Sequence, residues 1–462
     1  MSKTQYKLTF CSGAETVTGS DFLFEGPLDA SGRPLVRILV DCGLIQGEKI
    51  ATLANWEPFT FDPKEIDYLF ITHAHIDHIG RIPKLVHDGF SGKIFATPAT
   101  CALARPMLED TANILSHNTD EHLDKIYTPE ILARSLAGWT GIEYEKPYDL
   151  VPGVQVTMHN SGHILGAAFI EFKIGERKIV FSGDLGNSPS PILADTTPLK
   201  DADYLLVESV YGDRLHEDRA VRRDMLKDVL LDNYKREGTL VIPTFSLERS
   251  QEILFEINNM LETRQIPKMP VYLDSPLAIA VTKIYHDFSA ELNAEIQSHI
   301  KKHDDPFSFP GLVETLESDQ SKHILKMPNP KVIIAGSGMS SGGRVIHHER
   351  NYLSDPNNTL LLVGYQAVGT FGRQLEDGAK SIFIDRTTVA VNAQIKKISG
   401  YSGHRDSDGL IDFVAGSKDT LKKVFTVMGE PKSTIYLAQR LRNELGVDVM
   451  SPKGGESVIL DF

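Results

Sequence analysis

One short segment constrains this chain more than any other part of its sequence. It reads THAHIDHIG (residues 72–80) and directly follows an apolar stretch typical of a buried strand. His73 and His75 project to the same side of an extended backbone, because side chains alternate between its two faces. Asp77 and His78 come next, where we expect the chain to turn into a helix. Three histidines and one aspartate therefore gather within six positions.

These residue types are the ligands that divalent cations use. Imidazole nitrogens and carboxylate oxygens bind Zn²⁺ at about 2.0–2.2 Å. The first two side chains of the segment can hold one cation while the next two address a second. Two cations about 3.5–4 Å apart can clamp both oxygens of a phosphoryl displacement. The alternative is a polar surface loop that holds several histidines by accident, but imidazoles rarely gather this densely without a metal.

Further ligands are expected in two glycine-flanked turns downstream. His163 lies in SGHILG (residues 161–166) before an expected strand, and Asp184 lies in FSGDLG (residues 181–186) after one. Taken alone, each would be an ordinary turn residue. Beside the first segment, both are expected ligands. Asp184 suits a bridging position, because its two oxygens can serve two cations.

Composition limits the class of protein. Of 462 residues, 41% are apolar and 24% charged, which is ordinary for a globular chain. The net charge of −14 is opposite to that of a simple nucleic-acid-binding protein, so any phosphate must be held by a local patch or a bound cation. Three cysteines suit a reducing compartment. With no membrane-length apolar run and no secretory signal at the start, we expect a soluble cytoplasmic protein without a membrane partner.

The pattern of elements changes along the chain. Its first part is rich in short strands, its middle alternates helices with short apolar strands, and its tail from about residue 381 returns to short strands and helices. Alternation in the middle indicates βαβ units around a parallel sheet. The simplest organisation is an α/β insertion between two portions of a β-rich domain.

The order of these motifs resembles a known family. H-x-H-x-D-H, then a histidine, then an aspartate is similar to the metallo-β-lactamase fold, as are the early turns SGAETVTGS (12–20) and VDCG (40–43). VESVYG (207–212) resembles the acidic motif of the β-CASP subgroup, and SGHRD (402–406) resembles its second motif, whose histidine faces the scissile phosphate. The same holds for GSGMSSGGR (336–344) and GYQAVGT (364–370). The resemblance covers nearly the whole chain.

The resemblance implies an α/β fold: a four-layer αβ/βα sandwich with an inserted β-CASP domain as a lid over the metals. It implies a metallo-β-lactamase domain in two parts, residues 1–208 and 376–462, around a β-CASP domain at 209–375. Two Zn²⁺ are the implied cofactors. Motif matching gives their ligands: His73, His75 and His163 for one zinc, Asp77 and His78 for the other, and Asp184 between them. Glu208 would orient the ring of His404.

One position departs from the family pattern. The last metal ligand of the family is the histidine of a Val-His-Gly-Glu turn, whereas this chain reads VMGEP (427–431), with Met428 in its place. A thioether is a poor zinc ligand among oxygen and imidazole donors. The second metal site is therefore expected to be weak, and the number of metals stays open between one and two.

Five residues of the middle part are candidates for contacts with substrate. The segment TFSLERS (244–250) opens a helix whose backbone N–H groups could receive a phosphate, or it is a plain helix cap with a solvent-facing arginine. The glycine-rich run at 336–344 could wrap a phosphate in the same way. An arginine beyond the 364–370 segment could meet phosphate or face water. The residues are Ser246, Arg249, Ser337, Arg344 and Arg373.

The function implied is a zinc-dependent ribonuclease that hydrolyses RNA phosphodiester bonds. Asp77 would orient or deprotonate the attacking water, and His404 would stabilise the phosphate or protonate the leaving oxygen. Two alternatives stay open: a hydrolase of another ester or small phosphodiester, and a non-catalytic RNA-binding subunit. Cleavage within the RNA, from its 5′ end or both is not decided by the sequence. RNA is the expected partner, and self-association as a homodimer is a further candidate.

Overall fold

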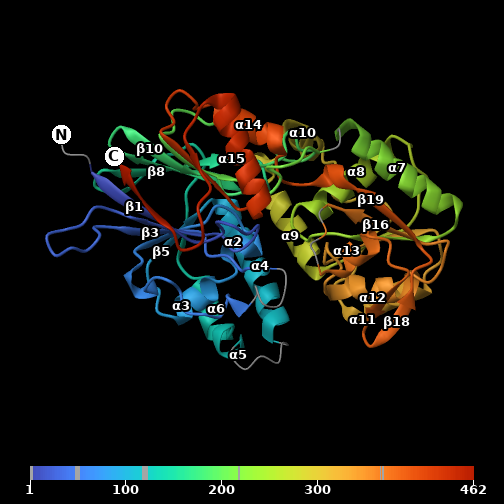
Figure 1. Cartoon of the computed structure of the whole chain (residues 1–462). Coiled ribbons are helices and arrows are strands. Elements are labelled where there is room, and N and C mark those ends of the chain that lie inside the picture. Colours follow the sequence, from blue (N-terminus) through green and yellow to red (C-terminus); the bar gives the residue numbers. More distant parts are fainter. Residues whose placement is uncertain (1–3, 47–52, 117–122, 217–218, 365, 367–368) are drawn as a thin grey trace. The chain divides into compact units, whose positions relative to one another are not determined.

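The computed structural model describes residues 4–46, 53–116, 123–216, 219–364, 366 and 369–462, which form two compact units (Figure 1). The first unit combines Met1–Leu215 with His404–Phe462, and the second is His216–Gly403. The expected insertion ends at 375, but the second unit continues to Gly403 because a strand at Gln394–Ile398 pairs with its sheet. Part of the segment expected at 364–370, residues 365, 367 and 368, lies outside the described residues.

The first unit contains two sheets, each with seven strands among the described residues. The first sheet has the order β22-β1-β2-β3-β4-β5-β6, with β1 (Gln5–Ser12), β2 (Asp21–Glu25), β3 (Arg37–Val40), β4 (Tyr68–Phe70), β5 (Lys93–Ala96), β6 (Trp139–Gly141) and β22 (Ser457–Asp461). The second has the order β21-β20-β11-β10-β9-β8-β7, with β7 (Tyr148–Val151), β8 (Val154–Asn160), β9 (Ala168–Ile174), β10 (Arg177–Phe181), β11 (Tyr204–Glu208), β20 (Lys423–Val427) and β21 (Val449–Met450). The first and last strands, β1 and β22, pair with each other in antiparallel fashion, so the two portions of the first unit share one sheet.

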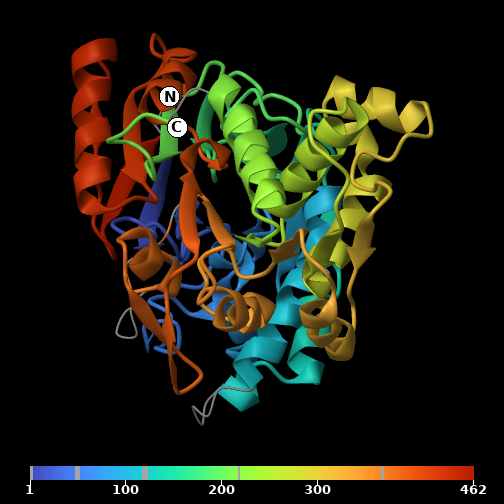
Figure 2. The same ribbon diagram turned by 90° about the vertical axis from the view of Figure 1, so that its right-hand side faces the viewer.

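The two sheets pack face to face over an aromatic core. Alternate residues of each strand point inward, as the ring of Phe24 does toward Phe172 across the sheets, at 6.1 Å between ring centres. The helices α2 (Ile76–Ile79), α3 (Ile82–His87), α4 (Pro98–Ser116), α5 (Leu123–Ile126) and α6 (Pro129–Ser135) lie beyond the first sheet. α14 (Ser407–Ala415) and α15 (Pro431–Leu445) cover the second sheet, and α15 is the red helix at its side in Figure 2. This is the expected four-layer sandwich, and that prediction is confirmed.

The ligand-bearing turns of the first unit are held by close backbone approaches. His73 and His75 follow β4, Asp184 follows β10, and His163 lies between β8 and β9. Two glycines allow neighbouring turns to touch the ligand segments. A Cβ at Gly43 would lie 1.5 Å from the carbonyl oxygen of Asp77, and a Cβ at Gly186 would lie 1.8 Å from that of Gly162. Any side chain at either glycine would push these loops apart.

The second unit is built on a parallel sheet, as the alternation of its elements predicts. Among the described residues the strand order is β14-β13-β15-β12-β16-β19, and each strand runs parallel to its neighbours. Its strands are β12 (Thr239–Pro243), β13 (Val271–Asp274), β14 (Leu312–Glu314), β15 (Lys331–Ala335), β16 (Thr359–Val363), β19 (Gln394–Ile398) and the hairpin β17 (Ser381–Ile384) with β18 (Thr387–Ala390). Its helices are α7 (Arg219–Lys235), α8 (Arg249–Glu262), α9 (Pro276–Asp287), α10 (Ala294–Lys301), α11 (Ser318–His323), α12 (Gly343–Tyr352) and α13 (Phe371–Glu376). Apolar cores form on both faces of this sheet.

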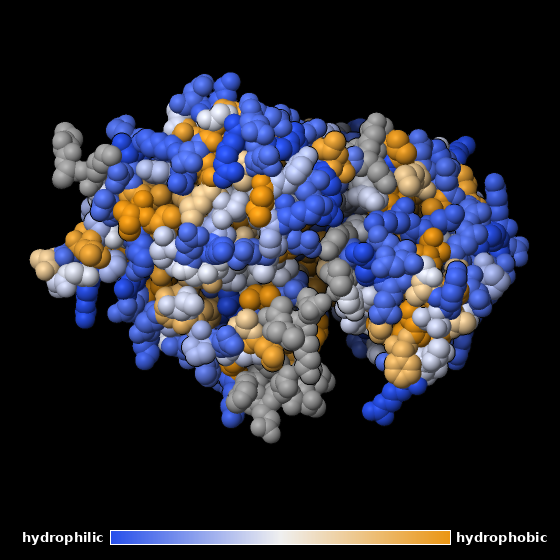
Figure 3. All heavy atoms as spheres, viewed as in Figure 1, coloured by the Kyte–Doolittle hydropathy of each residue, from blue (hydrophilic) through white to orange (hydrophobic). Residues whose placement is uncertain are grey.

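Hydrophilic residues cover most of the face drawn in Figure 3, with hydrophobic residues in scattered patches. Among the described residues, no helix combines the length and the apolar character needed to cross a membrane.

The second unit buries a carboxyl group whose titration should be visible in its stability. Glu248 is 4% exposed and accepts a hydrogen bond from the Tyr285 hydroxyl, and burial raises its pKa to about 8. The folded protein therefore holds a proton that the unfolded chain releases above about pH 4.5. The free energy of unfolding therefore falls as the pH rises from about 4.5 through 8. Glu248→Gln has no carboxyl group to titrate at this position and should avoid this fall, which is on the order of 4 kcal/mol.

Chemical unfolding at pH 5.5 and pH 8.5 measures this effect. The variant should lose less stability than the wild type between the two pH values, whereas Glu314→Gln, at an exposed position of the same unit, should behave as the wild type. Identical pH dependence of wild type and Glu248→Gln would contradict the assignment.

Candidate metal centre

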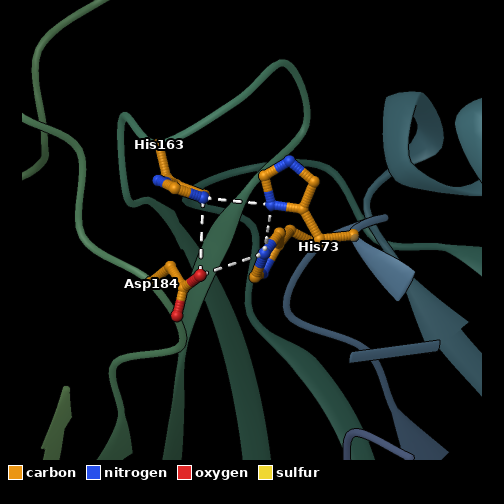
Figure 4. A group of neighbouring side chains, drawn as sticks. His73, His163 and Asp184 are labelled. Atoms are coloured by element: carbon orange, nitrogen blue, oxygen red, sulfur yellow. Dashed lines mark hydrogen bonds and ion pairs between the residues drawn. The ribbon is translucent and has the colours of Figure 1, made fainter. Parts of the chain in front are cut away.

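Four ligand atoms of the first unit converge on one point. The Nδ1 atom of His75 lies 3.1 Å from Nε2 of His73 and 3.2 Å from Nε2 of His163. Oδ2 of Asp184 lies 3.4 Å from each of these two Nε2 atoms (Figure 4). All four atoms lie within 4.8 Å of one another, close enough for one cation to bind them together. The four atoms form a cage for a single metal ion.

The protonation of the three imidazoles agrees with this interpretation. Burial lowers the pKa of His73, His75 and His163, which favours the neutral rings that bind metals. A neutral imidazole has one N–H and one lone pair, so facing nitrogen atoms cannot all be joined by good hydrogen bonds. A cation at the centre would satisfy the lone pairs together. These donors therefore fit a divalent metal.

A second group of donors shares Asp184. Oδ1 of Asp184 lies 3.5 Å from Nε2 of His78, which lies 3.9 Å from Oδ2 of Asp77. In the described part of the chain, neither Oδ1 of Asp184 nor Nε2 of His78 has a hydrogen-bond partner, although both atoms are buried. Unsatisfied buried polar atoms are costly, and a cation between them would remove the cost. Asp184 thus presents one oxygen to each group, and three residues are available for the second cation.

Asp41 was missed as a functional residue by the sequence reasoning, which used it only as part of an early turn. Its carboxylate accepts hydrogen bonds from Nδ1 of His78 at 2.7 Å and from the backbone N–H of Thr72 at 2.8 Å. These bonds fix the ring of His78 so that Nε2 faces Asp184. The signal that could have found it is an aspartate directly after a buried apolar strand, β3.

Met428 packs as an apolar residue. It follows β20, is 2% exposed, and belongs to the core between the two sheets. Its backbone N–H donates to the carbonyl oxygen of Gly13 at 2.7 Å. The sulfur atom crowds the same glycine, because a Cβ at Gly13 would lie only 2.7 Å from Sδ. The position that corresponds to the family's last ligand therefore adds to the core.

Glu208 and His404 form a buried pair beside the cage. Oε2 of Glu208 lies 3.2 Å from Nδ1 of His404, and Oε1 accepts the backbone N–H of Leu185 at 2.6 Å. The ring of His404 packs against that of His163, with 4.7 Å between ring centres. Burial opposes a charge on His404, but the carboxylates of Glu208 and Asp184 outweigh it and raise its pKa to about 9. Nδ1 of His404 is thus directed at Glu208, and the ring lies beside the donors of the cage.

The five candidate substrate residues all belong to the second unit, and its own groups engage all five; the hydroxyl oxygen of Ser337 accepts the backbone N–H of Ser341 at 3.2 Å. Arg249 is buried, pairs with Glu252 and lies over the ring of Tyr401, so it is not the solvent-facing arginine of the alternative interpretation. The remaining contacts are a salt bridge from Arg344 to Asp274 at 2.7 Å, one from Arg373 to Asp377 at 3.0 Å, and a hydrogen bond between the hydroxyls of Ser246 and Ser275 at 3.1 Å. Ser337 lies in the turn after β15. A role of these residues toward phosphate stays a prediction.

Comparison with protein families matches three consecutive models to the chain. Residues 34–207 match the metallo-beta-lactamase superfamily domain, and residues 250–375 match the Beta-Casp domain. Residues 388–452 match the Zn-dependent metallo-hydrolase RNA specificity domain.

Curated relatives match over most of their length. Ribonuclease TTHA0252 of Thermus thermophilus is 36% identical, with 96% of this chain and 98% of the relative covered. Transcription termination factor FttA of Methanosarcina mazei is 30% identical, with 99% and 72% covered. A crystal structure of a protein of unknown function from Enterococcus faecalis superimposes with a TM-score of 0.57 at 14% identity, over 99% of this chain and 100% of that chain, which shows a shared fold.

Proposed function

The chain belongs to the β-CASP ribonucleases of the metallo-β-lactamase superfamily, and on that basis we propose that it cleaves RNA at the metal centre of its first unit. It is a metal-dependent hydrolase that acts on phosphodiester bonds of RNA. The observation that carries the proposal for the site is the four-atom cage of His73, His75, His163 and Asp184. Its donor types and its size both suit a divalent cation.

Zinc is the proposed metal, and two unequal sites are the proposed number. Nitrogen and oxygen donors in a four-ligand cage suit Zn²⁺. The cage offers four protein ligands, whereas the second group offers three, from Asp77, His78 and Asp184. When bound, the cations supply Lewis-acid stabilisation of the phosphate and lower the pKa of a nearby water toward 7.

The chain's own residues would position the reacting groups. The Asp77 side chain is 19% exposed, so its carboxylate can reach a water and accept a proton from it. Glu208 holds the ring of His404 beside the cage, where the imidazole would stabilise a phosphate oxygen or protonate the leaving oxygen. Asp41 holds His78 in the same manner.

A second candidate is a non-catalytic RNA-binding subunit, which is favoured by one observation, the apolar packing of Met428. Loss of one ligand affects only the second group of donors, so the cage is intact. A homodimer, a cytoplasmic location and the choice between internal and terminal cleavage stay predictions.

Incubation of the purified chain with RNA labelled at either end tests the proposed function. We expect cleavage that stops after prolonged chelation and returns when Zn²⁺ is added, because the ligand cage alone cannot activate water. Product sizes from the two labels would give the polarity. Cleavage that persists in protein freed of metal, as checked by mass spectrometry, would contradict the proposal, and RNA binding without cleavage would favour the second candidate.

A further inference from the structure

The turn that follows Glu208 carries an arginine toward the candidate catalytic histidine. The ring of Tyr211 lies beside that of His404, with 6.1 Å between ring centres and 37° between planes. The guanidinium of Arg214 also lies near the Tyr211 ring, 5.6 Å from its centre. Tyr211 is thus a neighbour of both His404 and Arg214 beside the metal centre. All three belong to the first unit.

The backbone of this turn is held by hydrogen bonds within the turn and to Ser407. The N–H of Arg214 donates to the carbonyl oxygen of Tyr211, and the carbonyl oxygen of Arg214 accepts the N–H of Ser407 at 3.1 Å. The hydroxyl of Ser407 donates to the carbonyl oxygen of Gly212 at 2.7 Å. Gly212 also has no room for a side chain, because a Cβ there would lie 2.8 Å from the carbonyl oxygen of Ser433. The turn is therefore a rigid support for the Arg214 side chain.

Charged groups surround the partly exposed side chain of Arg214. Asp213 accepts from Nε of Arg214 at 2.9 Å, and its other oxygen pairs with Lys432 at 3.0 Å. One carboxylate that is 5% exposed is thus shared by two cations, whose side chains are 45% and 83% exposed. Glu430 also acts on Arg214 electrostatically and offsets part of the positive charge. Nearly half of the Arg214 side chain stays exposed beside Asp213, so a ligand can reach it from solvent.

We propose that Arg214 binds the phosphate of an RNA nucleotide adjacent to the scissile bond, and that Tyr211 is a positioning residue that holds Arg214 and His404 in line. This inference rests on the proposed function. A guanidinium suits phosphate because its planar donors match two phosphate oxygens. A chain with a net charge of −14 needs such local cations to hold RNA.

Binding of a fluorescent single-stranded RNA to the metal-free protein, measured against salt concentration, tests the inference without cleavage. Arg214→Ala should weaken binding about tenfold and lower the slope of log K against log salt by about 0.7, the value of one phosphate contact on a single strand. Arg214→Lys should keep the slope, because it keeps the charge. Arg105→Ala, which removes an exposed arginine of the same unit that pairs with Glu109, is the matched control and should change neither quantity.

Steady-state cleavage separates binding from chemistry. Arg214→Ala should raise KM more than it lowers kcat. Tyr211→Leu should raise KM and also lower kcat, because it loosens Arg214 and His404 together. An unchanged salt slope and KM in Arg214→Ala, while the wild type cleaves RNA, would overturn this inference alone. A wild type that neither binds nor cleaves RNA would overturn the proposed function with it.

Discussion

Asp184→Asn is expected to empty the metal centre and to reduce RNA cleavage by about 10⁴-fold. Asp184 is the one residue with an oxygen in each donor group: Oδ2 lies in the cage, and Oδ1 faces Nε2 of His78. Asparagine has nearly the same size but replaces one oxygen with an NH2 group, which cannot serve as a ligand. Metal content by mass spectrometry and initial cleavage rates measure the two effects.

The matched control for this prediction is Asp149→Asn, at an exposed aspartate of the same unit whose carboxylate accepts a hydrogen bond from the side chain of Gln155. It should keep metal and activity. If Asp184→Asn kept its metal content and its cleavage rate, the shared-carboxylate arrangement would be wrong.

Met428→His is expected to raise the metal content from about one to about two per chain after desalting. The second donor group has Asp77, His78 and Asp184, and an imidazole at the family's last ligand position would supply a fourth. In the wild type this position holds an apolar side chain packed against Gly13. Three ligands without the fourth should let the second cation exchange with solvent.

Met428→Leu distinguishes a ligand from a packing residue. Leucine keeps the volume and apolar character of this core position but has no sulfur, so the metal content should stay as in the wild type. A lower metal content in Met428→Leu would show that the sulfur binds metal. A wild type that already retains two metals, with no gain in Met428→His, would contradict the unequal sites. Thermal unfolding of both variants checks that the core tolerates the change.

The local pattern of the sequence predicts the ligand turns, and the family resemblance implies the sandwich, but neither marks every short strand. β2 and β5 have five and four residues, too few for a periodic pattern to stand out from neighbouring loops. Helices α9 and α10 are separated by a short 3-10 helix at Ser289–Glu291 and by Asn293, whose side chain caps α10. Such breaks depend on caps that a periodicity argument does not weigh.

The roles of some side chains depend on partners that lie far away along the sequence. Arg344 could be interpreted as a phosphate ligand because its partner Asp274 lies 70 positions away, at the end of another strand. Asp41 gained its role only once folding brought it to His78, 37 positions later. A sequence pattern shows which side chains could meet a ligand. It does not show which of them are already paired within the protein.

X-ray anomalous scattering at the zinc edge, from crystals of the zinc-loaded chain, tests the central claim most directly. A strong peak should lie about 2 Å from Nε2 of His73, Nδ1 of His75, Nε2 of His163 and Oδ2 of Asp184, and a weaker one beside His78. Besides the cage and the group of Asp184, Glu208 and His404, the described part of the chain holds a group of ligand-type side chains in the second unit, Glu262, His299 and Asp304, which offers an internal comparison. A strongest peak at that group, or none at the cage, would contradict the account.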